Sequence, residues 1–417
     1  MADSLFPSEL MEALGMLRPV FHASSWHSFL YLMAGLLLGQ AKAGVVRASL
    51  LAPPSYNWRR IPDLLRRNRW SGIKLMGALT SLILSRLYPE ALPTHLFWVL
   101  DLTYLEKPYA RAIEGILRHW RPHRKAGQGR TLKGHGLVLV GHLYQKSARR
   151  FRAFLLGGLL YLKQATPVEL GGQLLSQLPL PQEAHNVVVV DRGLTSIKLA
   201  KSAREQGAYT LGRVKANATF YLEATQADYK GRGRRPTYGA KFRADETPKE
   251  QMSRMEMSVP VDGKLVPGVV YRGSFLRRGF AAPVDLIRVE VGGLPPWLLM
   301  LTDPTLTTEE AIWAYYGRSQ VEVAIGEAKA LGLEAYRGRR LEGISRWPMV
   351  IGTVHSLLQL MAVGVLKVEL PRQGWPWYPV ENTVGAIQRR LIGWFLRRHF
   401  SDFSASEEKV EEIQKAA

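Results

Sequence analysis

The sequence predicts an α/β core that is interrupted by a mostly β region and flanked by helical segments. The apolar, β-branched run Asn186–Val190 is typical of a buried central strand. A helical pattern at Leu194–Glu205 and a strand pattern at Tyr209–Val214 follow it, as expected of an α/β sheet. Further strand-like runs, punctuated by Gly and Pro, then fill most of residues 216–303.

Both ends of the chain carry helical patterns. Trp26–Gly39 is apolar nearly all round and predicts a buried helix, whereas Ile73–Leu87 is amphipathic. Between them, Trp58–Trp70 carries five arginines. Such a helix can contact DNA phosphates, although a solvated helical face explains the arginines equally well. We therefore expect a helical DNA-binding domain at residues 1–90, and a helical tail at residues 367–417.

The composition indicates a polyanionic partner. The 417 residues carry a net charge of +21, and the pI is about 10.1. A chain this basic usually binds nucleic acid, and the alternative is a protein that merely tolerates its charge. There is no cysteine, which excludes a disulfide framework and a thiolate metal site. No signal peptide is visible and no apolar run reaches the roughly 20 residues of a membrane span, so we expect a cytoplasmic protein with no membrane partner.

Two aspartates follow predicted strands in the first part of the core, residues 91–215. Asp101 ends the short strand-like run Leu96–Leu100, and Asp191 comes directly after the apolar run described above. An acidic residue at a strand end lies where α/β sheets keep their sites. The alternative for Asp191 is a helix N-cap or a turn residue. The intervening run Phe151–Leu162 is long enough to be either a strand or a helix.

Residues 216–303 predict an inserted, mostly β subdomain, because too many strand-like runs occur there for a simple connection. Within it, the basic, Gly-rich segment Lys230–Arg243 predicts a loop that follows DNA phosphates, with Arg234 and Arg235 among its contacts. A plain surface loop is the alternative.

Residues 304–366 predict the second part of the core, which opens with a helix starting near Thr307 or Thr308. At about 100° per residue, four side chains fall within roughly 60° of one another on one face of this helix. They are Tyr315, Arg318, Glu322 and Lys329. A carboxylate flanked by two cations and a phenol suits a metal ion beside a phosphate backbone. The alternative is a solvated face with an Arg318–Glu322 pair.

The spacing Tyr-x2-Arg-x3-Glu-x6-Lys resembles a large group of bacterial insertion-sequence transposases, the cut-and-paste type with a DDE carboxylate triad. The run Asp101-Leu102-Thr103 matches the Asp-x-Ser/Thr pattern of the group's first catalytic position. The resemblance implies an RNase H-like (retroviral-integrase-like) core with an inserted β subdomain. It also implies that Asp101, Asp191 and Glu322 are both the catalytic residues and the metal ligands.

The resemblance further implies DNA-binding roles. Tyr315, Arg318 and Lys329 would position the phosphates of the transposon end, and Trp297 would stack on a flipped base. A core or edge-strand tryptophan is the alternative for Trp297.

The implied activity is cleavage of transposon-end phosphodiester bonds by a two-metal mechanism, followed by strand transfer into target DNA. Three hard carboxylate ligands favour Mg²⁺ or Mn²⁺, and zinc is not expected because no predicted helix carries two histidines at ligand spacing. The expected partners are double-stranded DNA and a second copy in a homodimeric synaptic complex, in a bacterial, nucleoid-associated setting. A repurposed nuclease or DNA-binding protein that no longer mobilises DNA is the alternative. Apolar strands followed by acidic residues argue against a ribosomal or RNA-associated protein.

Overall fold

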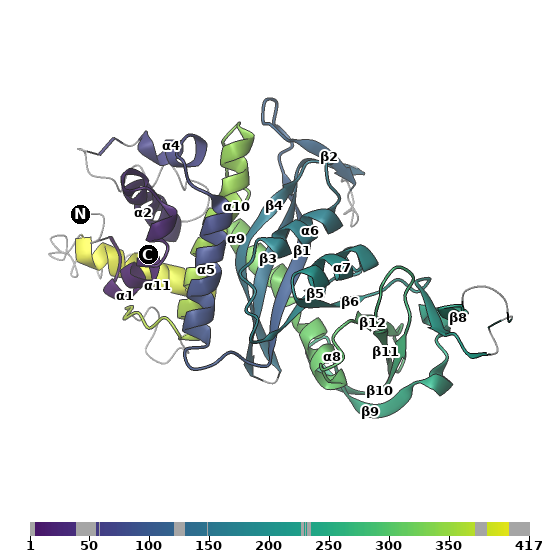
Figure 1. Ribbon diagram of the computed structural model, residues 1–417. Helices are drawn as coiled ribbons and strands as arrows, with labels where there is room; N and C mark the ends of the chain where they lie inside the picture. Colours follow the sequence, from purple (N-terminus) through teal and green to yellow (C-terminus); the bar gives the residue numbers. More distant parts are fainter. Residues whose placement is uncertain are drawn as a thin grey trace. The chain divides into compact units, whose positions relative to one another are not determined.

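The computed structural model describes residues 5–38, 56–57, 59–120, 130–147, 149–226, 229, 231, 235–371 and 382–399 (Figure 1). Arg234 lies outside this part of the chain. The chain divides into two compact units, one formed by Met1–Pro89 with Gly326–Ala417 and the other by Glu90–Ile325. Within the described ranges, no helix is both long enough and apolar enough to cross a bilayer.

The first unit is built from helices contributed by both ends of the chain. Its elements are α1 (Ser8–Gly15), the 3₁₀-helix η2 (Arg18–Val20), α2 (Ala23–Leu37), α4 (Arg60–Arg66), α5 (Gly72–Leu87), α10 (Leu341–Val363) and α11 (Val384–His399). The long helix α10 packs against α5, α4, α2 and α11. Nearly every side chain of α2 is buried, as its all-round apolar sequence predicts.

Arg346 on α10 connects the two halves of this helical unit. Its guanidinium donates to the backbone oxygens of Leu65 and Trp70, each at 2.9 Å. The same guanidinium lies over the Trp70 ring, 5.0 Å from its centroid. Because Arg346 is almost fully covered, these contacts and its ion pair with Glu342 at 2.9 Å together satisfy a buried charge.

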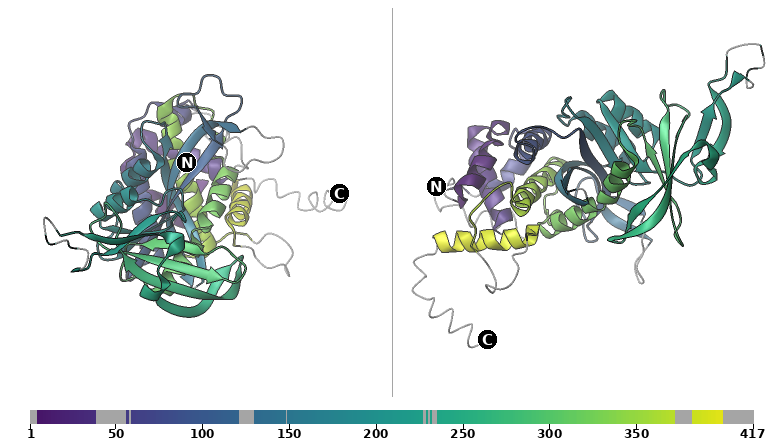
Figure 2. Two further views of the ribbon diagram at one scale, coloured as in Figure 1. Left: turned by 90° about the vertical axis from the view of Figure 1, so that its right-hand side faces the viewer. Right: turned by 90° about the horizontal axis from the view of Figure 1, so that it is seen from below.

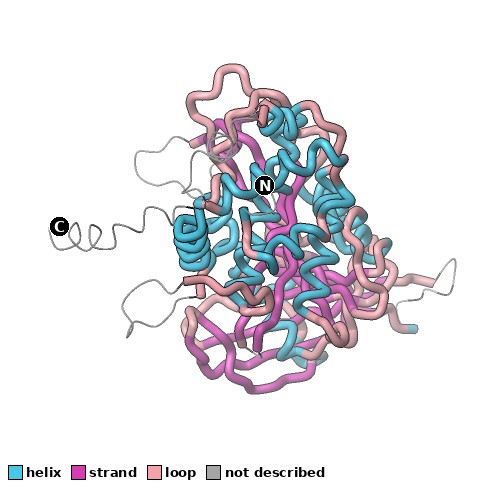
Figure 3. The backbone as a smooth tube through the Cα atoms, turned by 90° about the vertical axis from the view of Figure 1, so that its left-hand side faces the viewer, coloured by secondary structure: helices cyan, strands magenta, loops and turns pink. Residues whose placement is uncertain are grey.

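The second unit is organised around a large mixed sheet, whose strands are drawn in magenta in Figure 3. The main strand order is β2-β3-β1-β5-β6-β12-β11-β10-β9, and β4 also pairs with β3. In chain order the strands of this sheet are β1 (His95–Glu106), β2 (Leu117–Trp120), β3 (Thr131–Ser147), β4 (Arg150–Tyr161), β5 (His185–Val190), β6 (Ala208–Arg213), β9 (Ser253–Val261), β10 (Lys264–Phe275), β11 (Val284–Val291) and β12 (Trp297–Leu301). The pairs β1–β5 and β5–β6 are parallel, and the other pairs are antiparallel.

Helices cover both faces of the sheet's centre. The helices of this unit are α6 (Pro167–Ser176), α7 (Ile197–Glu205), α8 (Thr308–Gly317) and the start of α9 (Gln320–Ala330), with short 3₁₀-helices η4 (Ala244–Glu246) and η5 (Lys249–Gln251). On one face, α6 and α7 lie together over the strands (Figure 1), and Gly171 of α6 sits close to Leu100 of β1. On the other face, a Cβ on Gly317 of α8 would lie 2.5 Å from the Phe151 ring, so only glycine permits this contact.

The strands from residue 253 onward continue the main sheet, because β12 pairs with β6 through Leu299↔Arg213. A separate two-stranded sheet consists of β7 (Thr219–Glu223) and β8 (Tyr238–Arg243), and it projects from the rest of this unit (Figure 2). The predicted loop Lys230–Arg243 therefore ends in a strand. A hydrophobic cluster, which includes Phe220, Phe275 and Met300, packs beneath this hairpin and β10–β12.

Candidate active site

Asp101 and Asp191 occupy equivalent positions on two adjacent parallel strands. β1 and β5 pair in register from His95↔His185 to Leu100↔Val190, so the two aspartates are the next residues along each strand. Since neighbouring strands lie about 4.8 Å apart, both side chains start from adjacent backbone positions. The prediction that Asp101 ends its strand is wrong, because β1 continues to Glu106 in pairing with β3. Only the parallel pairing ends at Leu100.

The turn after β5 fixes the Asp191 side chain. Its Oδ1 accepts hydrogen bonds from the backbone N–H groups of Gly193 and Leu194, each at 3.0 Å. The Thr195 hydroxyl donates to the Asp191 carbonyl oxygen at 2.6 Å. A Cβ at Gly212 on β6 would lie 2.2 Å from the Thr195 hydroxyl oxygen, so this glycine makes room for the turn. Asp191 is therefore a turn residue and, at the same time, aligned with Asp101.

The helix that leads toward Glu322 starts where the sequence predicts, near Thr307 and Thr308. Thr307 caps α8, and the Thr307 and Glu310 side chains form a reciprocal capping box. The predicted single helix is wrong, because α8 ends at Gly317 and α9 begins at Gln320. In this break the N–H groups of Ser319 and Glu322 donate to carbonyl oxygens three residues earlier, so the turn is wound more tightly than an α-helix.

Arg318, in the break between the two helices, lies between two of the acids. Its Nη1 is 3.8 Å from Oδ1 of Asp101, and its Nη2 donates to Oε1 of Glu322 at 3.0 Å. The Arg318 side chain is mostly covered, whereas that of Glu322 is 63% exposed. The guanidinium therefore connects the helical acid to the acid on the sheet.

The electrostatics of Asp101 indicate that the three carboxylates interact. Burial of this side chain, which is 16% exposed, raises the pKa of the carboxyl from 3.8 to about 6. The Arg318 charge lowers that pKa, while the negative charges of Asp191 and Glu322 raise it further. In the metal-free protein, the positive charge of Arg318 therefore does not fully balance the negative charges of the three carboxylates.

Two further predicted DNA-binding residues lie at the same end of the sheet. The rings of Trp297 and Tyr315 meet edge to face, with centroids 6.3 Å apart. Burial raises the pKa of the Tyr315 phenol, while the charges of Arg318 and Arg213 lower it. Arg213 was missed by the sequence reasoning, although its position at the end of the predicted strand Tyr209–Val214 offered the same signal as Asp191.

Two other predicted DNA-binding residues, Lys329 and Arg235, also form contacts in the structure. Lys329 follows Glu322 by two turns on α9, and its ammonium forms an ion pair with Glu334 at 2.8 Å. Arg235 lies over the ring of Tyr229, 5.7 Å from its centroid. Gly326 on α9 has no atom within 4 Å of an added Cβ, so the helix surface beside Lys329 is open.

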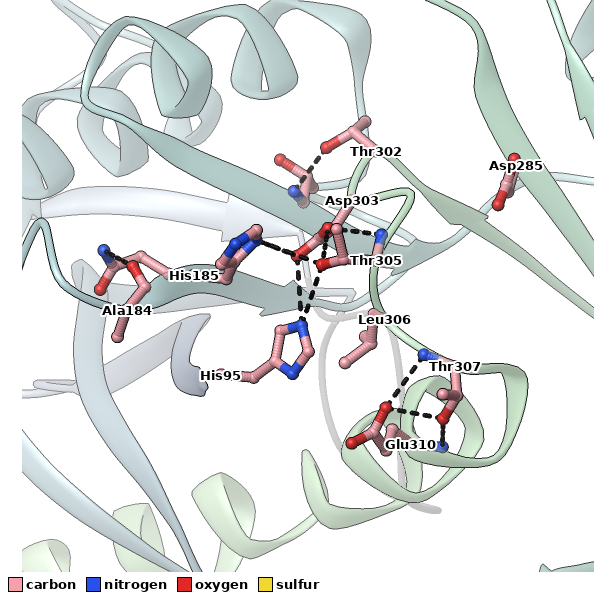
Figure 4. Close-up of polar contacts among 12 residues, drawn as sticks. His95, Ala184, His185, Asp285, Thr302, Asp303, Thr305, Leu306, Thr307 and Glu310 are labelled. Carbon is pink, nitrogen blue, oxygen red and sulfur yellow. Dashed lines mark hydrogen bonds and ion pairs between the residues drawn. The ribbon is translucent and has the colours of Figure 1, made fainter. Parts of the chain in front are cut away.

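A second group of possible metal ligands occurs elsewhere in the same unit. His95, His185 and Asp303 bring one ligand atom each to within 4.8 Å of one another (Figure 4). The sequence reasoning missed this group because it searched for histidines at helical spacing. These histidines are paired across two strands instead.

Comparison with known proteins identifies the domain that contains most of these residues. Residues 155–357 match the model of the transposase DDE domain, a range that includes Asp191 and Glu322 and begins after Asp101. A comparison with curated proteins gave no match. The large mixed sheet with helices on both faces is compatible with an RNase H-like fold of this class. Residues 155–357 therefore form a DDE-type transposase domain.

Proposed function

We propose that the protein cleaves phosphodiester bonds at the ends of a DNA element and joins the freed 3′ ends to target DNA, using Asp101, Asp191 and Glu322. The observation that carries this proposal is the position of Arg318 between Asp101 and Glu322. The alignment of Asp191 beside Asp101 supports the third member of the triad. The DDE domain match supports the reaction class.

The three acids fit a divalent cation. All are carboxylates, which are the oxygen ligands that Mg²⁺ and Mn²⁺ prefer. The negative charges of Asp191 and Glu322 raise the pKa of Asp101, so a bound cation would relieve repulsion that Arg318 only partly offsets. When bound, Mg²⁺ or Mn²⁺ would supply the activation of the attacking oxygen and the stabilisation of the leaving oxygen.

The chain's own residues then orient these groups and the DNA. Arg318 holds the exposed Glu322 carboxylate toward Asp101 and adds a positive charge for an end phosphate. Tyr315 and Arg213 lie beside it and suit further phosphate contacts. The partly exposed Trp297 offers a ring on which a displaced base could stack.

Other parts of the chain would extend the DNA contact. We assign Lys329, Arg234 and Arg235 to phosphate binding, because a net charge of +21 is typical of a protein with an extended anionic partner. The arginine-rich α4 supports end recognition by the helical N-terminal region. Two copies would hold the two ends together, so the proposed working form is a homodimer on DNA.

Labelled duplexes carrying the left and right ends of the element test the proposal. Wild-type protein should nick them in Mg²⁺ and should join them to a target plasmid. Asp101→Asn, Asp191→Asn and Glu322→Gln should each abolish cleavage while leaving end binding largely intact. Glu205→Gln, at an exposed carboxylate on α7, is the matched control and should cleave normally. Full cleavage by any one of the three test variants would remove that residue from the triad.

The same assay separates the second candidate function, a repurposed nuclease or DNA-binding protein that no longer mobilises DNA. Such a protein would bind or nick DNA but would give no strand-transfer product. The clustered carboxylates favour a catalytic protein over a pure binding module, which has no need to bury Asp101 beside other acids.

A further inference from the structure

Three potential metal ligands meet at the end of the sheet opposite the carboxylates. His95 opens β1, His185 opens β5, and the two are direct partners in the parallel register. Asp303 follows β12 in the connection that leads to α8. Figure 4 shows both imidazoles pointing toward the Asp303 carboxylate. Three segments far apart in sequence thus contribute one side chain each.

The distances among the ligand atoms approach those of a metal site. Oδ2 of Asp303 lies 3.4 Å from Nδ1 of His185 and 3.7 Å from Nε2 of His95. Tetrahedral zinc, with bonds of about 2.0–2.1 Å, places its ligand atoms about 3.3 Å apart. All three atoms lie within 4.8 Å of one another, so small rotations of the two rings would complete the geometry.

The buried carboxylate provides an independent reason to expect a cation. The Asp303 side chain is 0% exposed, and its Oδ2 accepts no hydrogen bond in the described part of the chain. No lysine or arginine among the described residues forms an ion pair with it. A buried carboxylate oxygen that accepts no hydrogen bond is costly, and a metal ion held between this oxygen and the two imidazoles satisfies it.

Thr305 forms hydrogen bonds around Asp303, but none of them reaches Oδ2 of Asp303. Thr305 donates its backbone N–H and its hydroxyl to Oδ1 of Asp303, at 2.9 and 2.7 Å. Its hydroxyl oxygen lies 3.2 Å from both His95 Nε2 and His185 Nδ1, so in the metal-free protein it can only accept from these rings. A metal ion would replace the protons on these two nitrogens. This network orients the aspartate and leaves Oδ2 facing the imidazoles, as a metal ligand requires.

We propose that His95, His185 and Asp303 bind a divalent first-row transition ion such as Zn²⁺, through Nε2, Nδ1 and Oδ2. Two imidazoles and one carboxylate select such ions over Mg²⁺, and a water completes the coordination. The ion links the β12–α8 connection to the starts of β1 and β5. Its role is structural, because it fixes the segment that leads into α8 and from there to Arg318 and Glu322.

The site is separate from the catalytic carboxylates and open to solvent on one side. Asp101 lies six residues beyond His95 on β1, which corresponds to about 20 Å along a strand. The His185 side chain is 38% exposed and stacks on the Tyr209 ring. Tyr209, Thr302 and Pro304 line a neighbouring cavity of about 460 Å³, through which an ion can enter.

Zinc binding by the full-length protein tests the proposal. Metal-stripped protein is dialysed against micromolar Zn²⁺, and the bound metal per chain is measured by mass spectrometry. We expect about one equivalent in wild-type protein and a rise in the midpoint of thermal unfolding. His185→Gln and Asp303→Asn should each lose that equivalent and the rise in midpoint. Because His185 is partly exposed, His185→Gln should fold even if Asp303→Asn does not.

The double variant Asp101→Asn/Glu322→Gln is the matched control, and it should keep its zinc because its changes lie at the other end of β1 and on α9. Circular dichroism of metal-free His185→Gln should match that of the wild-type protein. Zinc binding that is unchanged in His185→Gln, or absent from the wild-type protein, would overturn the proposal. Zinc lost only in the double variant would assign it to the catalytic carboxylates instead.

Discussion

Replacing Asp101 with asparagine should stabilise the metal-free protein at pH 8 while abolishing cleavage. Burial raises the pKa of this carboxyl to about 6, even though Arg318 opposes the shift, so its ionised form is unfavourable in the native state. Asparagine keeps the shape of the protonated acid and carries no charge. The substitution therefore removes a destabilising feature that the proposed metal site requires.

The sign and magnitude follow from proton linkage. Between the ordinary pKa of 3.8 and the native value of about 6, the native state binds more protons than the unfolded state. The free energy of unfolding therefore falls as the pH rises through this window, and the loss is complete above it. At pH 8 the cost is about 3 kcal/mol, and at pH 4 about 0.6 kcal/mol. Asp101→Asn should recover these amounts.

Urea unfolding in EDTA at pH 8 and pH 4 provides the measurement. The Asp101→Asn midpoint should exceed that of the wild-type protein at pH 8, and the two should nearly coincide at pH 4. Glu205→Gln is the control and should change little, because its carboxylate is exposed on α7. Adding Mg²⁺ should stabilise the wild-type protein but not Asp101→Asn. A variant less stable than the wild-type protein at pH 8 in EDTA would refute the reasoning, since Arg318 would then outweigh burial.

Two further substitutions test the surroundings of the acids. Arg318→Gln removes the cation that lowers the pKa of Asp101, so this pKa should rise in the variant. The acidic limb of the cleavage profile should therefore move to higher pH than in the wild-type protein. A kcat profile from pH 6 to 9 measures this, and an unmoved acidic limb would contradict it. Trp297→Ala should lower end cleavage by about 5- to 150-fold, the equivalent of about 1–3 kcal/mol of base stacking. Trp297→Phe should keep most of the rate in the same assay, and equal losses in both variants would argue against stacking.

The strands and acids of the core could be predicted because their signals are local. The apolar run before Asp191 identifies β5 without knowledge of its neighbours, and the Thr307 cap marks the start of α8. The spacing from Tyr315 to Glu322 was also visible in the sequence. The expected helix is nevertheless broken at Arg318, because backbone N–H groups there donate to the carbonyl three residues earlier instead of four.

The features that escaped prediction depend on contacts between distant segments. His95 and His185 are 90 residues apart and become partners only through the β1–β5 register. Arg213 reaches the site because β6 pairs with β5 on one side and β12 on the other. The same pairing makes the strands after residue 253 part of the main sheet, and no periodicity along the chain encodes it. Such pairings arise from long-range packing, which single-sequence patterns do not contain.

The adjacency of Asp101 and Asp191 determines which part of the proposed catalytic centre is rigid. Their separation is set by backbone hydrogen bonds in the middle of a folded sheet, so it cannot change without unfolding that sheet. Glu322 instead belongs to α9, the helix in which the chain passes from one compact unit to the other. In the proposed centre, two acids are therefore held by strand pairing, and only the third depends on the position of a helix.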